Sequence, residues 1–336
     1  MLDVEKSRNG FQEILSKPIR ELGLKLAGSP VETHVQRLYE ELQEKGITKF
    51  RPTCYLTDEW GCPSGEPVIG IPFYLASPDL SLLEKEMNDL EDTREIMMYL
   101  RHEAGHAFNY AYKLYQTPEW KQLFGPFRRP YRETYRPVPF SRNFVRHLAG
   151  WYAQKHPDED FAETFAVWLK PGAQWRRQYV GWGAERKLQY VEELMTSLDG
   201  RAPRRLPRRE VESLSSLKKT LREHYRRKRA YYTIHWPASY ERNLFRVFSS
   251  EPRHHLYPSA AQFLRLIRSE ISEIVARGTG VHHYTINHIV KHMIVRSRAL
   301  NLRLTISEEE ARQLTIVALT MQVMQVLRTG YHRIPL

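Results

Sequence analysis

Three residues in the first half of the sequence have the types and the spacing of a metal centre. His102, Glu103 and His106 fit the pattern H-E-x-x-H. On a helix the two histidines project from one face and can hold one zinc ion, while Glu103 can reach water on that ion as a general base. At the histidine and glutamate content of this chain, chance predicts on the order of 0.05 matches. The motif therefore suggests zinc chemistry and needs support from the elements around it.

The motif lies in a segment whose pattern is typical of a long, buried helix. No proline occurs between residues 93 and 115, and apolar residues recur there at helical spacing. These are Ile96, Leu100, Ala104, Ala107, Ala111 and Leu114. Gly105 costs about 1 kcal/mol in a helix interior relative to alanine, so we expect another element to pack closely against that turn.

A second helix, predicted to begin after His156, could supply a third metal ligand. Pro157 is suited to its first turn, acidic residues follow at 158–160, and residues 171–172 (Pro-Gly) end it. Glu159 and Glu163 are four residues apart and therefore share one face of this helix. Acidic residues in a first turn also simply complement the helix dipole, so that interpretation stays open for both glutamates. Between the two helices, residues 117–145 are rich in aromatic, basic and proline residues and are expected to form a long ordered loop.

Taken together, residues 102–106 and 152–165 resemble the gluzincin metallopeptidases, specifically the lethal-factor-like and Pro-Pro endopeptidase branch. They are most similar to a bacterial family of zinc-binding metallopeptidases. The resemblance extends over about residues 20–200. It says much less about the rest of the chain.

The resemblance implies a role for each of the residues near the motif. Zn²⁺ would be held by His102, His106 and Glu159. Glu163 would support a ligand histidine from behind, and Tyr152 would stabilise the oxyanion. The alternatives are that Glu163 is the third ligand in place of Glu159, and that Tyr152 serves only in aromatic core packing.

The elements before the motif predict a small sheet. Residues 50–56 and 68–75 are rich in β-forming residues, and residues 58–65 between them are typical of a hairpin loop. Pro72 cannot donate a ladder hydrogen bond, which places 68–75 at a sheet edge, where an extended peptide could add as a strand. The resemblance implies that this edge strand lies antiparallel to bound substrate. The expected fold is α+β, with a gluzincin-like catalytic domain followed by an all-α C-terminal domain.

Charge is distributed unevenly along the 336 residues. The chain carries a net charge of +12, but residues 1–200 hold 26 basic and 29 acidic side chains, whereas residues 201–336 hold 25 and 10. The Arg/Pro stretch 201–209 separates the two parts and is typical of a linker. We therefore expect a zinc metallopeptidase domain at 1–200, a linker at 201–209 and a basic helical domain at 210–336.

Helical patterns in the second part predict helices near 209–232, 259–277, 284–300 and 307–329. Two features there could bind a ligand. The basic run 226–229 with the tyrosines that follow could contact phosphates, although a solvated basic face is commoner. The histidines at 282, 283, 288 and 292 could form a second metal site, although no acid or cysteine lies close to them in the sequence.

The leading hypothesis is a zinc peptidase that cleaves peptide or protein substrates with metal-activated water and Glu103 as general base. The alternative is a non-catalytic binding module whose basic helical half engages nucleic acid or an acidic protein, with a structural or vestigial metal site. The N-terminus lacks the apolar segment of a signal peptide, and no apolar run approaches the roughly 20 residues of a membrane span. Two cysteines, Cys54 and Cys62, are too few for a disulfide scaffold. We therefore expect a soluble, cytoplasmic protein with reduced thiols.

Overall fold

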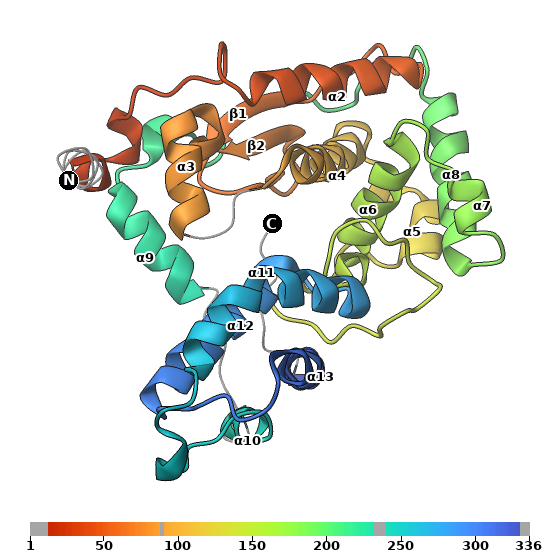
Figure 1. Ribbon diagram of the computed structural model, residues 1–336. Helices are drawn as coiled ribbons and strands as arrows, with labels where there is room; N and C mark the ends of the chain where they lie inside the picture. The colour runs from red at the N-terminus through yellow and green to blue at the C-terminus, as the bar shows by residue number, and fades with distance from the viewer. Residues whose placement is uncertain (1–12, 88–90, 232–239, 330–336) are drawn as a thin grey trace.

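The computed structural model describes residues 13–87, 91–231 and 240–329 (Figure 1). This part of the chain is α+β and mostly helical. Its strands are β1 (Thr53–Thr57) and β2 (Val68–Pro72). The first lobe contains the helices α2 (Glu32–Glu44), α3 (Pro78–Met87), α4 (Thr93–Tyr112), α5 (Pro118–Phe124), α6 (Pro157–Leu169), α7 (Trp175–Gln178), α8 (Gly183–Ser197) and α9 (Leu221–Tyr231). The second lobe contains α10 (Tyr240–Phe245), α11 (Ala260–Thr279), α12 (His283–Ala299) and α13 (Glu308–Thr329).

The two strands form a parallel pair, so the predicted hairpin at 58–65 is wrong. Thr53 lies opposite Val68 and the two strands run in the same direction. The segment between the strands therefore leads the chain back to the end of the sheet at which β1 begins. Within this segment Gly61 forms a bridge with β2, where Gly61 O accepts a hydrogen bond of 2.8 Å from Gly70 N. As one of only two strands in the pair, β2 is an edge strand. All its residues are nevertheless buried, and Gly61 already occupies its outer edge at Gly70.

The motif helix forms as the sequence predicts. Asp92 caps α4 by accepting a hydrogen bond of 2.8 Å from Glu95 N, and the Glu95 carboxylate accepts from Asp92 N in return. The helix ends at Lys113, which adopts a left-handed conformation with φ of 56°. Nearly every residue after Glu95 is buried, because α4 lies in the middle of the first lobe.

Helices α4 and α6 cross in close contact at Gly105. A Cβ atom at this position would lie 2.8 Å from the Cα of Ala162 and 3.1 Å from the Cβ of Phe165. Real side chains do not approach so closely, so only glycine allows this crossing. The expectation that another element packs tightly against this turn is therefore confirmed, and that element is the helix carrying Glu159.

The segment between these helices differs in part from the expected loop. It begins with the short helix α5, capped by Thr117, whose hydroxyl accepts from Trp120 N. Residues 126–150 then run without regular structure across the first lobe, and we call them the strap. The strap is fixed by side chains: His156 Nε2 donates to Arg129 O at 2.8 Å, and the Tyr135 hydroxyl donates to Gly150 O at 2.6 Å.

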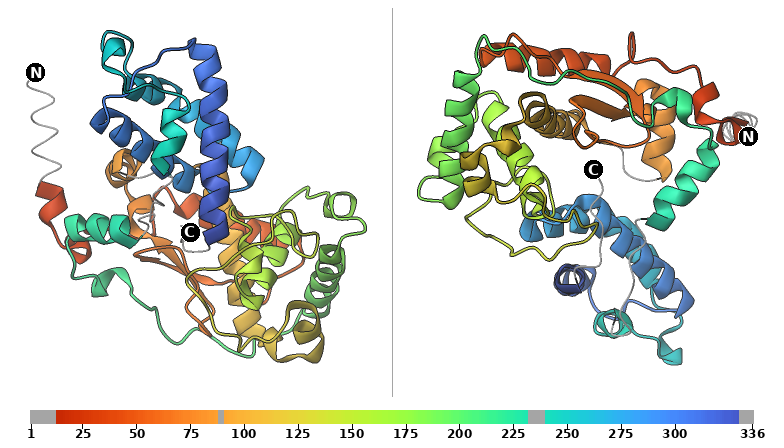
Figure 2. Two further views of the ribbon diagram at one scale, coloured as in Figure 1. Left: turned by 90° about the horizontal axis from the view of Figure 1, so that it is seen from below. Right: turned by 180° about the vertical axis from the view of Figure 1, so that it is seen from behind.

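The hydrophobic residues form two cores. The first extends from Ile19 to Tyr225, and the second from Leu244 to Leu327. The expected linker lies against the first core, because Arg205 N donates to Ala111 O at 2.9 Å and its guanidinium pairs with Glu66. Helix α9 also packs on the first core. Figure 2 shows α10 to α13 on one side of the first lobe. Where the chain divides into independently folding units stays a prediction.

The second lobe is helical, as predicted, with α10 as an additional short helix. It meets the first lobe at the turn between α11 and α12, where Gly150 N donates to Gly280 O at 2.7 Å. Cys54 and Cys62 are free thiols. In the described part of the chain, every helix is too short or too polar to cross a bilayer.

Candidate metal centre

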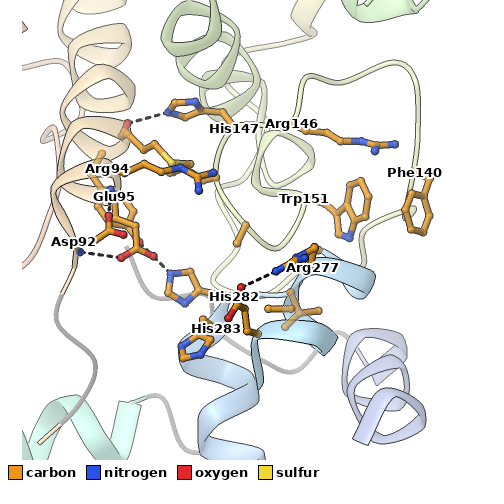
Figure 3. Close-up of a pocket in the computed structure, with 18 residues that line it drawn as sticks. Asp92, Arg94, Glu95, Phe140, Arg146, His147, Trp151, Arg277, His282 and His283 are labelled. Carbon is orange, nitrogen blue, oxygen red and sulfur yellow. Dashed lines mark hydrogen bonds and ion pairs between the residues drawn. The ribbon is translucent and has the colours of Figure 1, made fainter. Parts of the chain in front are cut away.

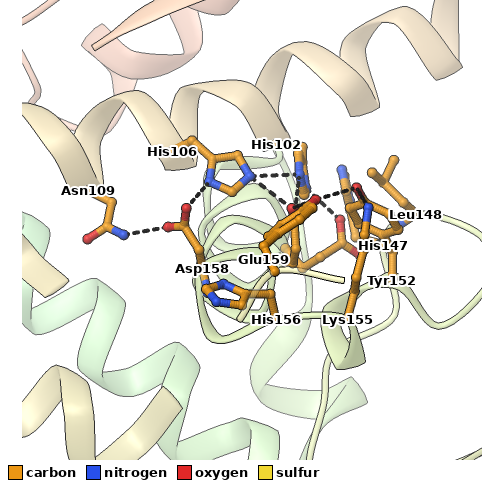
Figure 4. Close-up of polar contacts among 12 residues, drawn as sticks. His102, His106, Asn109, His147, Leu148, Tyr152, Lys155, His156, Asp158 and Glu159 are labelled. Atoms are coloured by element: carbon orange, nitrogen blue, oxygen red, sulfur yellow. Dashed lines mark hydrogen bonds and ion pairs between the residues drawn. The ribbon is translucent and has the colours of Figure 1, made fainter. Parts of the chain in front are cut away.

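Three donor atoms from α4 and α6 converge in the first lobe (Figure 4). Glu159 Oε2 lies 3.0 Å from His102 Nε2 and 3.1 Å from His106 Nε2, and the two Nε2 atoms are 3.1 Å apart. All three side chains are buried. Among the described residues, this is the group of His, Cys, Asp or Glu side chains whose donor atoms are close enough together to hold a metal ion.

The donor set suits zinc. Metal–ligand distances of about 2.0–2.1 Å place the donors of a tetrahedral zinc site roughly 3.4 Å apart. The three atoms lie a few tenths of an ångström closer than that, so small side-chain shifts would admit the ion. Two imidazoles and one carboxylate also leave a fourth position open, as in catalytic zinc sites.

A carboxylate supports His102 from behind. Glu163 Oε1 lies 2.8 Å from His102 Nδ1, and Glu163 Oε2 accepts from Leu148 N at 2.9 Å. A partner of this kind fixes the ring and directs Nε2 at a metal. The geometry thus places Glu159 among the converging donors and Glu163 on the far nitrogen of His102.

A second carboxylate, not predicted from the sequence, lies behind His106. Asp158 Oδ2 lies 3.2 Å from His106 Nδ1. Asp158 is itself held by two donors on α4, since Asn109 Nδ2 donates to Oδ1 at 2.7 Å and the Tyr110 hydroxyl donates to Oδ2. The only sequence signal was an acidic residue next to Glu159. Which acid of that first turn faces His106 is determined by the crossing of α4 and α6.

The charges of the site favour a bound cation. Burial by itself lowers the pKa of His102, but the hydrogen-bonded carboxylates of Glu159 and Glu163 outweigh it and raise that pKa to about 9. Burial raises the pKa of Glu103; His102 and His106 oppose this shift, and Glu159 adds to it. A carboxyl with a raised pKa is suited to accept a proton and return it.

Two tyrosines and a lysine lie beside the donors. The Tyr152 ring is 5.6 Å from the His102 ring, and its hydroxyl accepts from Lys155 Nζ at 3.1 Å. The Tyr131 hydroxyl, on the strap, donates to Glu159 Oε1 at 2.5 Å and lies 3.3 Å from the Tyr152 hydroxyl. The resemblance predicts a role for Tyr152 at the site, whereas the sequence patterns predict none for Tyr131 or Lys155. Tyr131 lies in an irregular segment, where no periodicity indicates what a side chain faces.

A cavity of about 620 Å³ lies between the lobes (Figure 3). His147, Leu148 and Trp151 line it, and Leu148 N is the group that donates to Glu163. His282 also lines this cavity and contacts the Tyr99 hydroxyl through Nε2 at 3.1 Å. Within the described ranges, the histidines of α12 and the turn before it do not gather into a second metal-binding group.

Comparison with known families supports the same chemistry. Residues 73–176 match the model of a family described as "Putative zinc-binding metallo-peptidase". The matched region contains all of α4 and α6, and with them the H-E-x-x-H motif and Glu159. No curated protein and no solved structure matches the chain. The similarity to a zinc-binding metallopeptidase family is thereby confirmed over residues 73–176, while the gluzincin type and the lethal-factor-like branch stay predictions.

Proposed function

We propose that this chain is a zinc-dependent peptidase of the gluzincin type, with His102, His106 and Glu159 as its metal ligands. One observation carries the proposal: their three donor atoms lie 3.0–3.1 Å from one another, in a region similar to a zinc-binding metallo-peptidase family. Zn²⁺ held by these residues would act as a Lewis acid and would lower the pKa of a bound water.

The side chains around the metal perform the proton transfers. Glu103 takes a proton from the attacking water as the new C–O bond forms, and gives it to the leaving amine as the C–N bond breaks. Tyr152 donates a hydrogen bond from its hydroxyl to the carbonyl oxygen, which gains negative charge in the transition state. Lys155 can only donate, so it occupies a lone pair of the Tyr152 oxygen and leaves the hydroxyl proton for the substrate.

The carboxylates behind the histidines orient the ligands. Glu163 accepts from His102 Nδ1, and Asp158 Oδ2 lies 3.2 Å from His106 Nδ1, so that with zinc bound both Nε2 atoms would be unprotonated and would face the metal. The same contacts raise the basicity of the imidazoles and strengthen zinc binding.

The alternative of a nucleic-acid module receives less support from the structure. Lys228, at the centre of the basic run on α9, is turned inward, where its Nζ lies 3.0 Å from Glu84 and 3.4 Å from Glu59. Its side chain is 8% exposed, so this charge is not available to a phosphate. An anionic partner of residues 210–336 stays a prediction from their net charge.

Metal analysis combined with a peptide-cleavage assay tests the proposal. We expect one zinc per chain in wild-type protein, loss of hydrolysis on chelation, and recovery when zinc is returned. His106→Ala should abolish both zinc binding and hydrolysis, whereas His255→Ala, at an exposed position of the second lobe, should leave both unchanged. Wild-type protein that takes up no zinc would refute the proposal.

A further inference from the structure

We propose that Tyr131 is a positioning residue that makes Glu159 a one-oxygen ligand. The inference rests on the proposed function, since it concerns how the third ligand is presented. Nothing in the sequence motif or in the family match assigns a role to this tyrosine.

The two oxygens of Glu159 have different partners. Oε2 faces the histidines, 3.0 Å from His102 Nε2 and 3.1 Å from His106 Nε2. Oε1 faces away from them and accepts the Tyr131 hydroxyl at 2.5 Å. A carboxylate can bind a metal through one oxygen or through both. The hydrogen bond from Tyr131 occupies Oε1, so that only Oε2 is available to bind the metal.

The direction of the protons around Tyr131 follows from the donors available. An ionised Glu159 only accepts, so the Tyr131 proton points at Oε1. In the substrate-free site the Tyr131 oxygen can then accept from the Tyr152 hydroxyl 3.3 Å away, and the Tyr152 oxygen accepts from Lys155. When a substrate carbonyl is bound, the Tyr152 proton turns to it, while the Tyr131 proton stays on Glu159. Hydrogen bonds that run in one direction polarise one another, which strengthens the last bond, the one to Glu159.

Two residues next to α6, His156 and Lys155, hold Tyr131 in position. His156 caps α6 by accepting from Asp158 N at 3.1 Å, and with its other ring nitrogen donates to Arg129 O at 2.8 Å. The same histidine thus fixes the start of the helix that carries Glu159 and the strap two residues before Tyr131. Lys155 Nζ lies over the face of the Tyr131 ring, 4.5 Å from its centre, and stabilises the ring position by a cation–π interaction.

Tyr131→Phe tests this arrangement by removing one oxygen atom. The side chain is 53% exposed, so the substitution leaves the hydrophobic core intact. Tyr135→Phe is the matched control, because it removes a hydroxyl of the same strap that donates to Gly150 O at 2.6 Å and not to a carboxylate of the metal centre. Three quantities are measured in both variants: zinc affinity by chelator competition, the visible spectrum of the Co²⁺-substituted protein, and hydrogen exchange of residues 126–150.

We expect Tyr131→Phe to bind zinc roughly 10- to 100-fold more weakly, with a changed cobalt spectrum and unchanged exchange in the strap. Tyr135→Phe should keep the wild-type affinity and spectrum. Wild-type affinity and spectrum in Tyr131→Phe would overturn this inference alone. So would equal losses in both variants with faster exchange of the strap, because Tyr131 would then be only an anchor. Wild-type protein that binds neither metal would instead overturn the proposed function itself.

Discussion

Gly105 and Ala162 touch where the two helices of the metal centre cross. A Cβ atom at position 105 would lie 2.8 Å from the Cα of Ala162 and 3.0 Å from its carbonyl oxygen. Gly105 directly precedes His106, and Ala162 lies three residues after Glu159 on α6. The distance between the helix axes at this point therefore sets the distance between the histidine nitrogens and the Glu159 carboxylate.

Gly105→Ala should separate α4 from α6 and weaken the metal centre. Overpacking of this kind costs about 1–3 kcal/mol, and the gain in helix propensity offsets only about 1 kcal/mol of it. We expect a lower free energy of unfolding and weaker zinc binding, measured by urea denaturation of the metal-free protein and by chelator competition.

Gly278→Ala is the control for that substitution. Gly278 lies in α11 with no atom within 4 Å of the added Cβ, so alanine should be neutral or should stabilise the protein by up to about 1 kcal/mol. If Gly105→Ala were equally benign in both assays, the crossing would not control the site.

The two glutamates of α6 should differ in what they contribute to zinc binding. Glu159→Gln removes the charged donor beside both Nε2 atoms, whereas Glu163→Gln removes the partner behind His102. We expect Glu163→Gln to weaken zinc binding by roughly 10- to 100-fold and Glu159→Gln to weaken it considerably more. Calorimetric titration of metal-free protein measures both, with the exposed Glu193→Gln as control. The reverse order of effects would make Glu163 the ligand.

Tyr152→Phe and Lys155→Met should lower turnover while each variant still takes up one zinc per chain, because neither residue is among the converging donors. Tyr152→Phe should lower kcat by about 10²- to 10³-fold, as expected for loss of one oxyanion donor. Lys155 acts through the Tyr152 hydroxyl, so Lys155→Met should lower kcat less, and the double variant should be no slower than Tyr152→Phe. Additive losses in the double variant would show that Lys155 acts independently of Tyr152.

The docking of α9 should be sensitive to acid. Burial by itself raises the pKa of Asp58, but His224, whose Nδ1 lies 2.7 Å from Oδ1, and Lys219 outweigh it and lower that pKa to about 2. Because this value lies below the 3.8 of an unperturbed group, the contacts stabilise the fold above pH 4 and lose their effect as the pH falls to 2. The shift corresponds to about 2 kcal/mol.

Asp58→Asn measures that contribution. Its free energy of unfolding should lie about 2 kcal/mol below that of wild type at pH 6 and should approach the wild-type value near pH 2. The exposed Asp199→Asn should follow wild type throughout. A deficit of the same size at both pH values would mean that charge on Asp58 is not its cause.

Periodicity in the sequence predicts the helices that carry the site well, because both are bounded by strong local signals. The acids and Pro157 at the start of α6 and the long apolar pattern of α4 suffice to place His102, His106 and Glu159 on two helices. Gly105 also predicts a tertiary contact. Glycine destabilises a helix interior relative to alanine, so its presence indicates that another element packs closely against this turn.

The parts that the sequence does not predict depend on long-range contacts. The strands before the motif can be predicted from their β-forming residues. Their parallel pairing depends on how the segment between them packs, including the bridge between Gly61 and Gly70. Asp158 is one of three acids in its turn, and the helix crossing alone selects it for His106. Tyr131 is placed by hydrogen bonds of the strap, which leave no periodic pattern in the sequence.

The most direct test of the central claim is peptide cleavage by Glu103→Gln compared with wild type. Both zinc-loaded proteins are incubated with a proteome-derived peptide mixture, and new peptide termini are identified by mass spectrometry. Glutamine keeps the shape of the side chain but cannot accept the proton from water, so zinc content should remain one per chain while the cleavages made by wild type disappear. Glu103→Gln protein that cleaves the same peptides as wild type at a comparable rate would contradict the account.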